Sequence, residues 1–273
     1  MKKFIAVAMT VVMSGLLLAG CGGSSAGNTS GSAPANAEAG KAATPQKIVI
    51  GLDDTFAPMG FRDDSGNLVG FDIDMAKEAA SRLDMEVEFK PIDWNSKEVE
   101  LNSKKIDMIW NGLTITEERK KNILFTNPYM ANRQIIVVLP GSDIKTKADL
   151  AGKVIGTQEG SSSVDAINAE PEVAKSFAEL RTYADYVAAL NELKIGRIDA
   201  VVADEVVSRY YMSKKPGEYA VIEDNFGEEE YGVGLRKDDT ELLAKLQGAL
   251  DAMKAEGKSA EISKKWFGED IVK

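Results

Sequence analysis

The chain has 273 residues, of which 44% are hydrophobic, and carries a formal net charge of −10 at pH 7. This length and composition predict a globular protein with one large or two medium domains, and the negative charge argues against nucleic acid or anionic lipid as an electrostatic partner. The sequence has no histidine, which excludes Ser-His-Asp and Cys-His catalysis and His-based zinc sites, and its one cysteine, Cys21, cannot form an internal disulfide.

Residues 1–20 have the pattern of a secretory signal, with two lysines followed by an apolar run and then small residues. The run is short for a transmembrane helix, which needs about 20 apolar residues. Residues 18–21 resemble a bacterial lipoprotein box, which implies cleavage before Cys21 and a diacylglycerol on its thiol. A free cysteine after a plain signal is the alternative. The rest of residues 21–45 is rich in Gly, Ser, Ala and Pro, which predicts a flexible linker.

The body of the chain alternates predicted strands and helices. The predicted strands are 47–53, 86–93, 107–110, 134–140, 153–158, 198–205 and 231–237. The predicted helices are 72–83, with Asp72 as a possible cap, 96–104, one after Thr116, one from about Val164, 239–256 and one around Trp266. This alternation predicts an α/β fold of parallel β-α-β units, in which ligands bind beyond the carboxyl ends of the strands. Asp53 with Phe56, Trp94, and 111–114 follow three such ends, which indicates a shared pocket.

The segment 107–119 joins a short strand to the start of a helix. Thr116, followed by two glutamates, has the pattern of a helix N-cap with acidic residues in the first turn. Such a junction offers unpaired N–H groups and the Thr114 hydroxyl, while Gly112 lets a ligand approach the backbone. Arg119 adds a two-donor fork suited to a carboxylate. The alternative is a surface Arg119 paired with one of those glutamates.

A second strand-to-helix junction lies at 158–163, where Gly160 and three serines precede a helix. This favours a second anion-binding site, with a plain helix cap as the alternative. A serine nucleophile would need Gly where Val164 stands. The motif Lys-Ile-Asp at 105–107 is echoed by Arg-Ile-Asp at 197–199, which indicates two similar α/β lobes.

Residues 70–83 resemble the signature of the polar amino-acid family of extracellular solute-binding proteins, which serve ABC importers. Further segments of that pattern follow in order, namely IDWNS, WNGLTITEER, GRIDAVVADE, YGVGL and EISKKWFG, so the resemblance covers residues 46–270. It implies an α/β, two-lobed periplasmic-binding-protein-like (type II) fold. Each lobe would be a mostly parallel sheet flanked by helices, and two crossover strands would join them. We expect lobe 1 at 46–131 plus 228–273 and lobe 2 at 134–225, with the crossovers near 132–134 and 225–230.

The resemblance also implies residue roles. The α-carboxylate of an amino acid would be bound by Arg119, Thr114, Ser161 and Ser162. Its α-ammonium would be bound by Asp204 and the carbonyl of Gly112. Phe56 and Trp94 would form aromatic walls, and Asp53 and Gln158 would lie near the side-chain tip. Asn111 stands where the family often has Ser or Ala, so the bulky pair Trp110 and Asn111 would reshape the pocket floor. Trp94 as a core residue and Asp204 as a helix cap are the alternatives.

The function implied is a lipid-anchored extracytoplasmic receptor at the outer face of the bacterial cytoplasmic membrane. It would bind a polar L-amino acid and deliver it to an ABC transporter permease, with no cofactor, metal or catalytic residue, and we expect a monomer. Asp53 suits glutamine or a basic amino acid, and cystine stays open. The alternative is a periplasmic dehydratase-like enzyme of the same fold acting on a cyclic carboxylic acid. Only Asp53, Glu159 or Asp204 could then serve as its acid or base.

Overall fold

The computed structural model describes residues 46–273. The predicted signal peptide, the lipidation site Cys21 and the linker lie outside the described residues. Within the described part, no helix is both long and apolar enough to cross a membrane.

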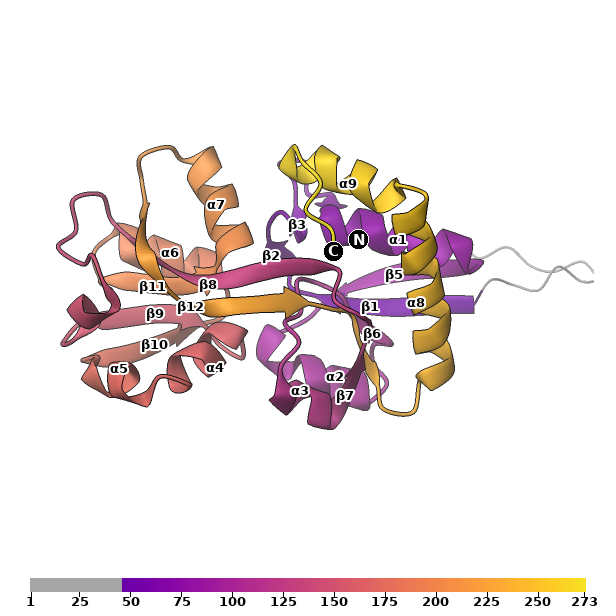
Figure 1. The fold of residues 1–273 in the computed structure, drawn as a ribbon, viewed down its shortest axis with the longest axis horizontal. Coiled ribbons are helices and arrows are strands. Elements are labelled where there is room, and N and C mark those ends of the chain that lie inside the picture. Colours follow the sequence, from indigo (N-terminus) through magenta and orange to yellow (C-terminus); the bar gives the residue numbers. More distant parts are fainter. Residues whose placement is uncertain (1–45) are drawn as a thin grey trace, which may run out of the picture. The chain divides into compact units, whose positions relative to one another are not determined.

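The first of two five-stranded sheets has the strand order β5-β1-β6-β13-β7 (Figure 1). Its strands are β1 (Gln46–Leu52), β5 (Met85–Pro91), β6 (Met108–Ile109), β7 (Ile123–Phe125) and β13 (Gly234–Arg236). The helices with it are α1 (Phe71–Arg82), η1 (Trp94–Ser96), α2 (Lys97–Asn102), α3 (Glu117–Asn122), α8 (Thr240–Ala255) and α9 (Lys258–Phe267). A small sheet contains β2 (Thr55–Phe56), β3 (Gly60–Arg62) and β4 (Leu68–Val69). We call these elements lobe 1.

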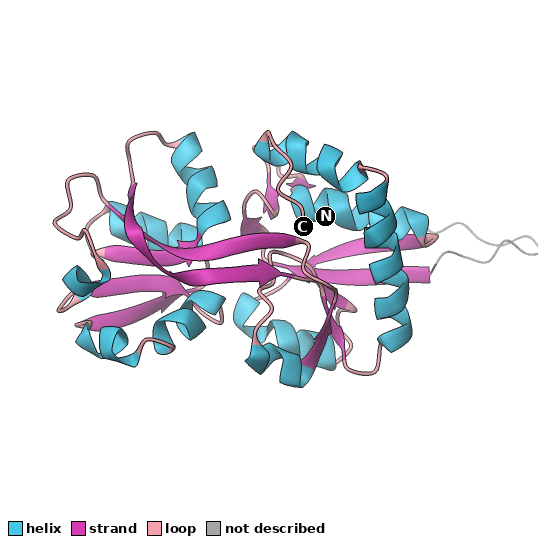
Figure 2. Ribbon diagram, viewed as in Figure 1, coloured by secondary structure: helices cyan, strands magenta, loops and turns pink. Residues whose placement is uncertain are grey.

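The second sheet has the strand order β10-β9-β11-β8-β12. Its strands are β8 (Met130–Val138), β9 (Val154–Gln158), β10 (Glu179–Tyr183), β11 (Ala200–Asp204) and β12 (Ala220–Tyr231). The helices with it are η2 (Lys147–Leu150), α4 (Ser162–Asn168), α5 (Pro171–Ser176), α6 (Tyr186–Lys194) and α7 (Glu205–Lys214). We call these elements lobe 2. Helices cover both faces of each sheet, so the sheets are buried as in α/β proteins (Figure 2).

The two sheets are mixed rather than purely parallel. In lobe 1, β1 pairs in parallel with β5 and β6, while β13 is antiparallel to both neighbours. In lobe 2, β9 pairs in parallel with β10 and β11, while β8 is antiparallel to β11 and β12. Strands β8 and β13 enter their sheets without a preceding helical crossover, and such a crossover is what parallel pairing requires.

Strands β8 and β12 run side by side between the lobes (Figures 1 and 2). They pair antiparallel from Val138 with Ala220 to Met130 with Tyr231, with register shifts on both sides of Asn225. The crossover segments predicted at 132–134 and 225–230 fall within these two strands. The exact limits of the lobes remain a prediction.

The echoed Ile-Asp motifs occupy matching places in the two sheets. The Asp107 carboxylate before β6 accepts the N–H of Val49 at 2.9 Å, and the Asp199 carboxylate before β11 accepts the N–H of Val154 at 2.8 Å. In each case the aspartate ties the third strand of the sheet to the second, four residues before Asp53 in one lobe and before Gln158 in the other. The echo therefore reflects a repeated structural element, and the ends of β1 and β9 are equivalent positions.

The predicted role of Asp72 as a helix cap is wrong. Helix α1 begins at Phe71 with Gly70 as its N-cap, so Asp72 lies inside the first turn. Its buried carboxylate accepts hydrogen bonds from the Gly112 N–H at 2.7 Å and from the Tyr129 hydroxyl at 2.9 Å. The position of Asp72 near the start of a helix fits the pattern of a capping residue. Its carboxylate instead binds the backbone of the loop after β6, a contact between residues distant in sequence.

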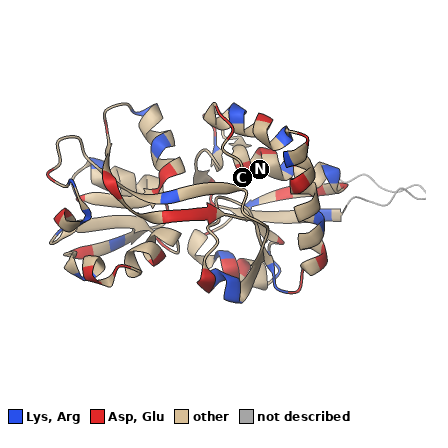
Figure 3. Cartoon of the chain, viewed as in Figure 1, with Lys and Arg blue, Asp and Glu red and all other residues tan. Residues whose placement is uncertain are grey.

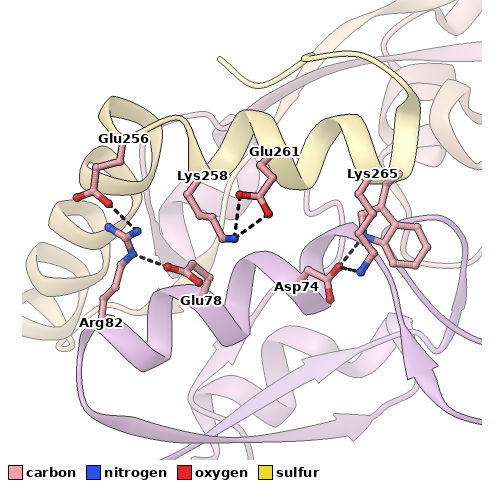
Figure 4. Close-up of polar contacts among 8 residues, drawn as sticks. Asp74, Glu78, Arg82, Glu256, Lys258, Glu261 and Lys265 are labelled. Atoms are coloured by element: carbon pink, nitrogen blue, oxygen red, sulfur yellow. Dashed lines mark hydrogen bonds and ion pairs between the residues drawn. The ribbon is translucent and has the colours of Figure 1, made fainter.

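The C-terminal helices are tied to α1 by polar contacts (Figure 4). Asp74 accepts hydrogen bonds from Lys265 Nζ at 2.6 Å and from Trp266 Nε1 at 2.8 Å, and Arg82 contacts both Glu78 and Glu256. Partly exposed ion pairs of this kind contribute little each. These polar contacts fix the orientation of α9 along α1, while the packing of apolar side chains between the helices provides the stability.

Candidate functional site

The predicted site residues converge where lobe 1 meets lobe 2. Apart from Gly112, which is also buried, each has at most 7% of its surface exposed. These residues are Asp53, Phe56, Trp94, Asn111, Thr114, Arg119, Gln158, Ser161, Ser162 and Asp204. The first six belong to lobe 1 and the last four to lobe 2. The structure therefore brings strand ends from both sheets into one buried region.

Arg119 points into this region, so the alternative of a surface ion pair is wrong. Its guanidinium donates to the Thr114 carbonyl at 2.8 Å and, across the lobes, to the Gly160 carbonyl at 3.1 Å. The two glutamates that could have paired with it contact Lys120 and Lys121 instead. Thr116 caps α3 as predicted, because its hydroxyl accepts the Arg119 backbone N–H. The guanidinium is thus buried against neutral carbonyls, an arrangement that favours an anionic partner.

A second buried cation, Lys97, lies next to Arg119. Its Nζ donates to the Gly160 carbonyl at 2.7 Å and to the Trp94 carbonyl at 3.2 Å. Burial, with a smaller contribution from the Arg119 charge, lowers the pKa of Lys97 from 10.5 to about 7. One carbonyl of lobe 2 therefore accepts hydrogen bonds from two cationic side chains of lobe 1.

Hydroxyl groups from both lobes meet beside Arg119. Thr114 Oγ1 and Ser162 Oγ are 3.0 Å apart, and either can be the donor. Ser161 is the N-cap of α4 by position, but its hydroxyl donates to the Gln158 carbonyl at 2.7 Å and makes no capping bond. The side chain of Ser161 therefore does not act as a helix cap, which was the alternative to an anion-binding site.

Asp204 lies at the end of β11 and makes no side-chain cap bond to α7. Its carboxylate accepts hydrogen bonds from Asn132 Nδ2 at 2.8 Å and from the Tyr231 hydroxyl at 2.5 Å. Burial, reinforced by the nearby Glu229 charge, raises the pKa of Asp204 to about 7. A cation beside this carboxylate would favour its charged form.

Asp53 directly follows β1, Gln158 ends the equivalent strand β9, and the two side chains contact each other across the lobes. Gln158 Nε2 donates to Asp53 Oδ2 at 2.7 Å, while Thr55 donates to Asp53 Oδ1 through its N–H and its hydroxyl. Burial raises the pKa of Asp53 from its ordinary value. Asn111 supports this corner, because its Oδ1 accepts the Asp53 backbone N–H at 3.1 Å.

The two predicted aromatic walls have different surroundings. Phe56 packs against Tyr186 of lobe 2, with 5.9 Å between ring centroids. It also borders Gly112, where φ is +58° and an added Cβ would lie 2.8 Å from the Phe56 ring, so glycine is required there. Trp94 belongs to an apolar cluster that includes Leu101, and Lys97 Nζ lies 5.0 Å from its ring centroid. Trp94 is therefore a core residue on one side, and its role as a wall stays a prediction.

The sequence interpretation missed four polar residues of this region: Lys97, Asn132, Gln134 and Glu229. Asn132 and Gln134 lie on β8 and are at most 7% exposed. Gln134 Nε2 donates to Ser162 Oγ at 3.2 Å, and Gln134 also accepts from the Ser163 hydroxyl. The one available signal was the spacing of the two amides, because residues two apart on a strand project from the same face.

A separate hollow lies away from the predicted site. It has a volume of about 870 Å³ and is lined by Phe61, Arg62, Tyr210, Tyr211, Trp266 and neighbouring charged residues, none of them a predicted site residue. Tyr211 nevertheless bridges the lobes there, because its hydroxyl donates to the Thr55 carbonyl at 2.8 Å. The predicted site is filled by contacts between the lobes, which is why it is not itself a large hollow.

Comparisons with known proteins give a consistent result. The profile of bacterial extracellular solute-binding proteins, family 3, matches residues 48–269. The L-cystine-binding protein TcyJ of Escherichia coli (strain K12) is 33% identical over 228 residues, which are 83% of this chain and 84% of that protein. The histidine-binding periplasmic protein of Salmonella typhimurium is 36% identical, over 86% of this chain and 93% of that protein.

Solved structures agree. An ABC uptake transporter substrate-binding protein from Streptococcus pneumoniae with bound histidine matches with a TM-score of 0.80 and 40% identity, over 83% of this chain and 94% of that chain. The predicted two-lobed type II fold is thereby confirmed. These relatives are named for what they bind, so the comparisons do not support the dehydratase-like alternative.

Proposed function

Because the chain belongs to the bacterial extracellular solute-binding proteins of family 3, we propose that it is the receptor of an ABC importer and binds a polar L-amino acid between its lobes. The observation that carries this proposal is the distribution of buried charge. Arg119 on lobe 1 faces the Gly160 carbonyl of lobe 2, and Asp204 of lobe 2 has only neutral donors. A zwitterion supplies the missing partner of each group.

The roles of the site residues follow from this arrangement. Arg119, the Thr114 and Ser162 pair and the amide of Ser161 would bind the α-carboxylate. Asp204 would accept the α-ammonium together with the Gly112 carbonyl. Burial and convergence of these residues support the assignment, since polar groups removed from water need partners.

The side chain of the ligand would extend toward the corner formed by Asp53 and Gln158, between Phe56 and Trp94. A buried carboxylate beside an amide suits glutamine, a basic amino acid or cystine. Relatives named for cystine, histidine and lysine, arginine and ornithine binding support this range. Asn111 acts in this proposal through Asp53, whose backbone it holds.

We further propose that the receptor is anchored through a lipid on Cys21 at the outer face of the cytoplasmic membrane and works as a monomer. The lipoprotein-box pattern of residues 18–21 supports the anchor. Cys21→Ser should move the protein from the membrane fraction to the soluble fraction of its host. Retention of this variant at the membrane would contradict lipidation.

Isothermal titration calorimetry with a panel of L-amino acids tests the central proposal. We expect at least one of glutamine, arginine, lysine, histidine or cystine to bind far more tightly than the others. If none of the panel bound more tightly than about millimolar, which corresponds to about 4 kcal/mol, the proposal would be wrong.

A further inference from the structure

The end of β12 brings a second carboxylate to the site. On neighbouring strands, Asp204 of β11 pairs with Gln134 of β8, and Asn132 of β8 pairs with Glu229 of β12. Residues directly opposite each other, and residues two apart on one strand, project from the same face of a sheet. The side chains of Asp204, Gln134, Asn132 and Glu229 therefore share one face. Figure 3 shows the acidic end of β12 as a red segment near the centre of the view.

Glu229 is half-buried, and one of its carboxylate oxygens makes its contacts inside the site. Its Oε1 accepts hydrogen bonds from Thr114 Oγ1 at 2.9 Å, Asn132 Nδ2 at 2.6 Å and Gln134 Nε2 at 2.9 Å. These donors come from lobe 1 and from a strand that links the lobes. Because Thr114 also contacts Ser162 of lobe 2, Glu229 lies where both lobes and the linking strands meet.

The two carboxylates are close and lack a cation. Asn132 Nδ2 donates to Asp204 Oδ1 at 2.8 Å and to Glu229 Oε1 at 2.6 Å, so a single neutral amide group bridges them. The remaining donors to this pair are hydroxyls and another amide. Two carboxylates held together by neutral donors repel each other, and a cation between them would relieve the repulsion.

We propose that Glu229 is a ligand-contacting residue, and that it forms with Asp204 a two-carboxylate site for the α-ammonium of the amino acid. This inference rests on the proposed function and deepens it. Glu229 selects ligands that carry an ammonium group next to the carboxylate, because an acid without that group leaves the two carboxylates without a cation between them.

The adjacent glutamates provide a matched control. Successive residues of a strand face opposite sides, so Glu228 and Glu230 point away from the face that carries Glu229. Glu228 is exposed, and Glu230 forms an ion pair with Lys273 at 2.5 Å. Glu228→Gln removes the same charge one residue away, without touching Asn132 or Thr114.

The test uses the full-length chain and calorimetry with L-arginine and L-histidine, each compared with its deaminated counterpart, guanidinovaleric acid or imidazolepropionic acid. For the amino acid that binds wild type, Glu229→Gln should weaken binding by about ten- to hundredfold, the loss of one charge-assisted hydrogen bond. The affinity for the deaminated acid should change by less than about threefold. Glu229→Asp should retain part of the amino-acid affinity, and Glu228→Gln all of it.

Three results would overturn the role of Glu229 while leaving the proposed function intact. Unchanged affinity in Glu229→Gln would show that the carboxylate does not contact the ammonium. Equal losses for the amino acid and its deaminated counterpart would show a structural role. Tighter binding would show that Glu229 competes with the ligand. If wild type bound neither amino acid nor any other member of the panel, the proposed function itself would fail.

Discussion

Replacement of Lys97 by methionine tests whether burial between the lobes lowers the pKa of this amine. Lys97 is 4% exposed, and its Nζ donates to two backbone carbonyls rather than to a carboxylate. Its pKa falls from 10.5 to about 7, mainly through burial. At about 1.36 kcal/mol per pKa unit, keeping this amine charged costs at most about 5 kcal/mol. Methionine keeps the length of the side chain and removes the charge.

The sign of the effect depends on pH. The folded-state pKa lies below the unfolded value, so between about pH 7 and pH 10.5 the unfolded chain binds more protons, and wild-type stability rises with pH. Below about pH 7 the Lys97→Met variant does not carry the free-energy cost of a buried charged amine. It does lose the hydrogen bonds of Lys97, which contribute roughly 1.5–3 kcal/mol. We therefore expect the variant to be more stable by about 2–3 kcal/mol at low pH, and less stable near pH 10.5, where the cost has vanished.

Urea unfolding of the full-length chain, at several pH values from about 6 to about 10, measures this difference. The control is Lys254→Met, at an exposed position of α8, which should follow the wild-type curve throughout. If Lys97→Met changed the stability by the same amount at every pH, the pKa of Lys97 would be the same in the folded and unfolded states, and the account of a pKa lowered by burial would be refuted.

Three further predictions concern binding. Arg119→Ala should abolish detectable binding of every amino acid in calorimetry while urea unfolding changes little; unchanged affinity would contradict the carboxylate assignment. Gly160→Ala should weaken binding at least about tenfold, because φ is +68° there and the new Cβ would lie 2.8 Å from the Asn95 Cα of lobe 1; equal affinity would show that the lobes need not approach so closely. Asp53→Asn should lower the affinity for arginine or lysine about tenfold relative to glutamine; an unchanged ratio in a ligand panel would remove Asp53 from side-chain recognition.

Local signals in the sequence were sufficient for part of the site. Thr116 has the N-cap pattern, and this fixes where α3 starts and hence how far Arg119 lies from the end of β6. Asp53 and Gln158 each directly follow or end a strand, so placing both at sheet ends required only the period of the strands. Residues whose position depends on one element and its terminus were therefore predictable.

Residues whose role depends on strand register were not predictable in this way. In the sequence, Glu229 is the middle residue of an acidic run, a pattern typical of an exposed segment. Only the pairing of β12 with β8, which places Glu229 opposite Asn132, shows that it faces the site. Lys97 reads as a solvated helix residue, but it is buried because Gly160 of the other lobe covers it. Asp72 was misread for the same reason, since its partners Gly112 and Tyr129 are distant in sequence. Tertiary pairing of this kind leaves no local pattern.

Closure and ligand binding are coupled through the same polar atoms. In the structure, Arg119 and Lys97 of lobe 1 share the Gly160 carbonyl of lobe 2, and Glu229 shares Asn132 with Asp204. Both clusters therefore hold charged groups on neutral partners. The first cluster exists only while the lobes are together, and the second, within the lobe 2 sheet, is joined to lobe 1 by the Thr114 hydroxyl, which donates to Glu229. In the proposed binding mode, an amino acid would replace neutral partners by a carboxylate at one cluster and an ammonium at the other. Because Arg119 would bind the carboxylate beside groups of lobe 2, the ligand would shift the equilibrium toward closure by its differential affinity for the closed state.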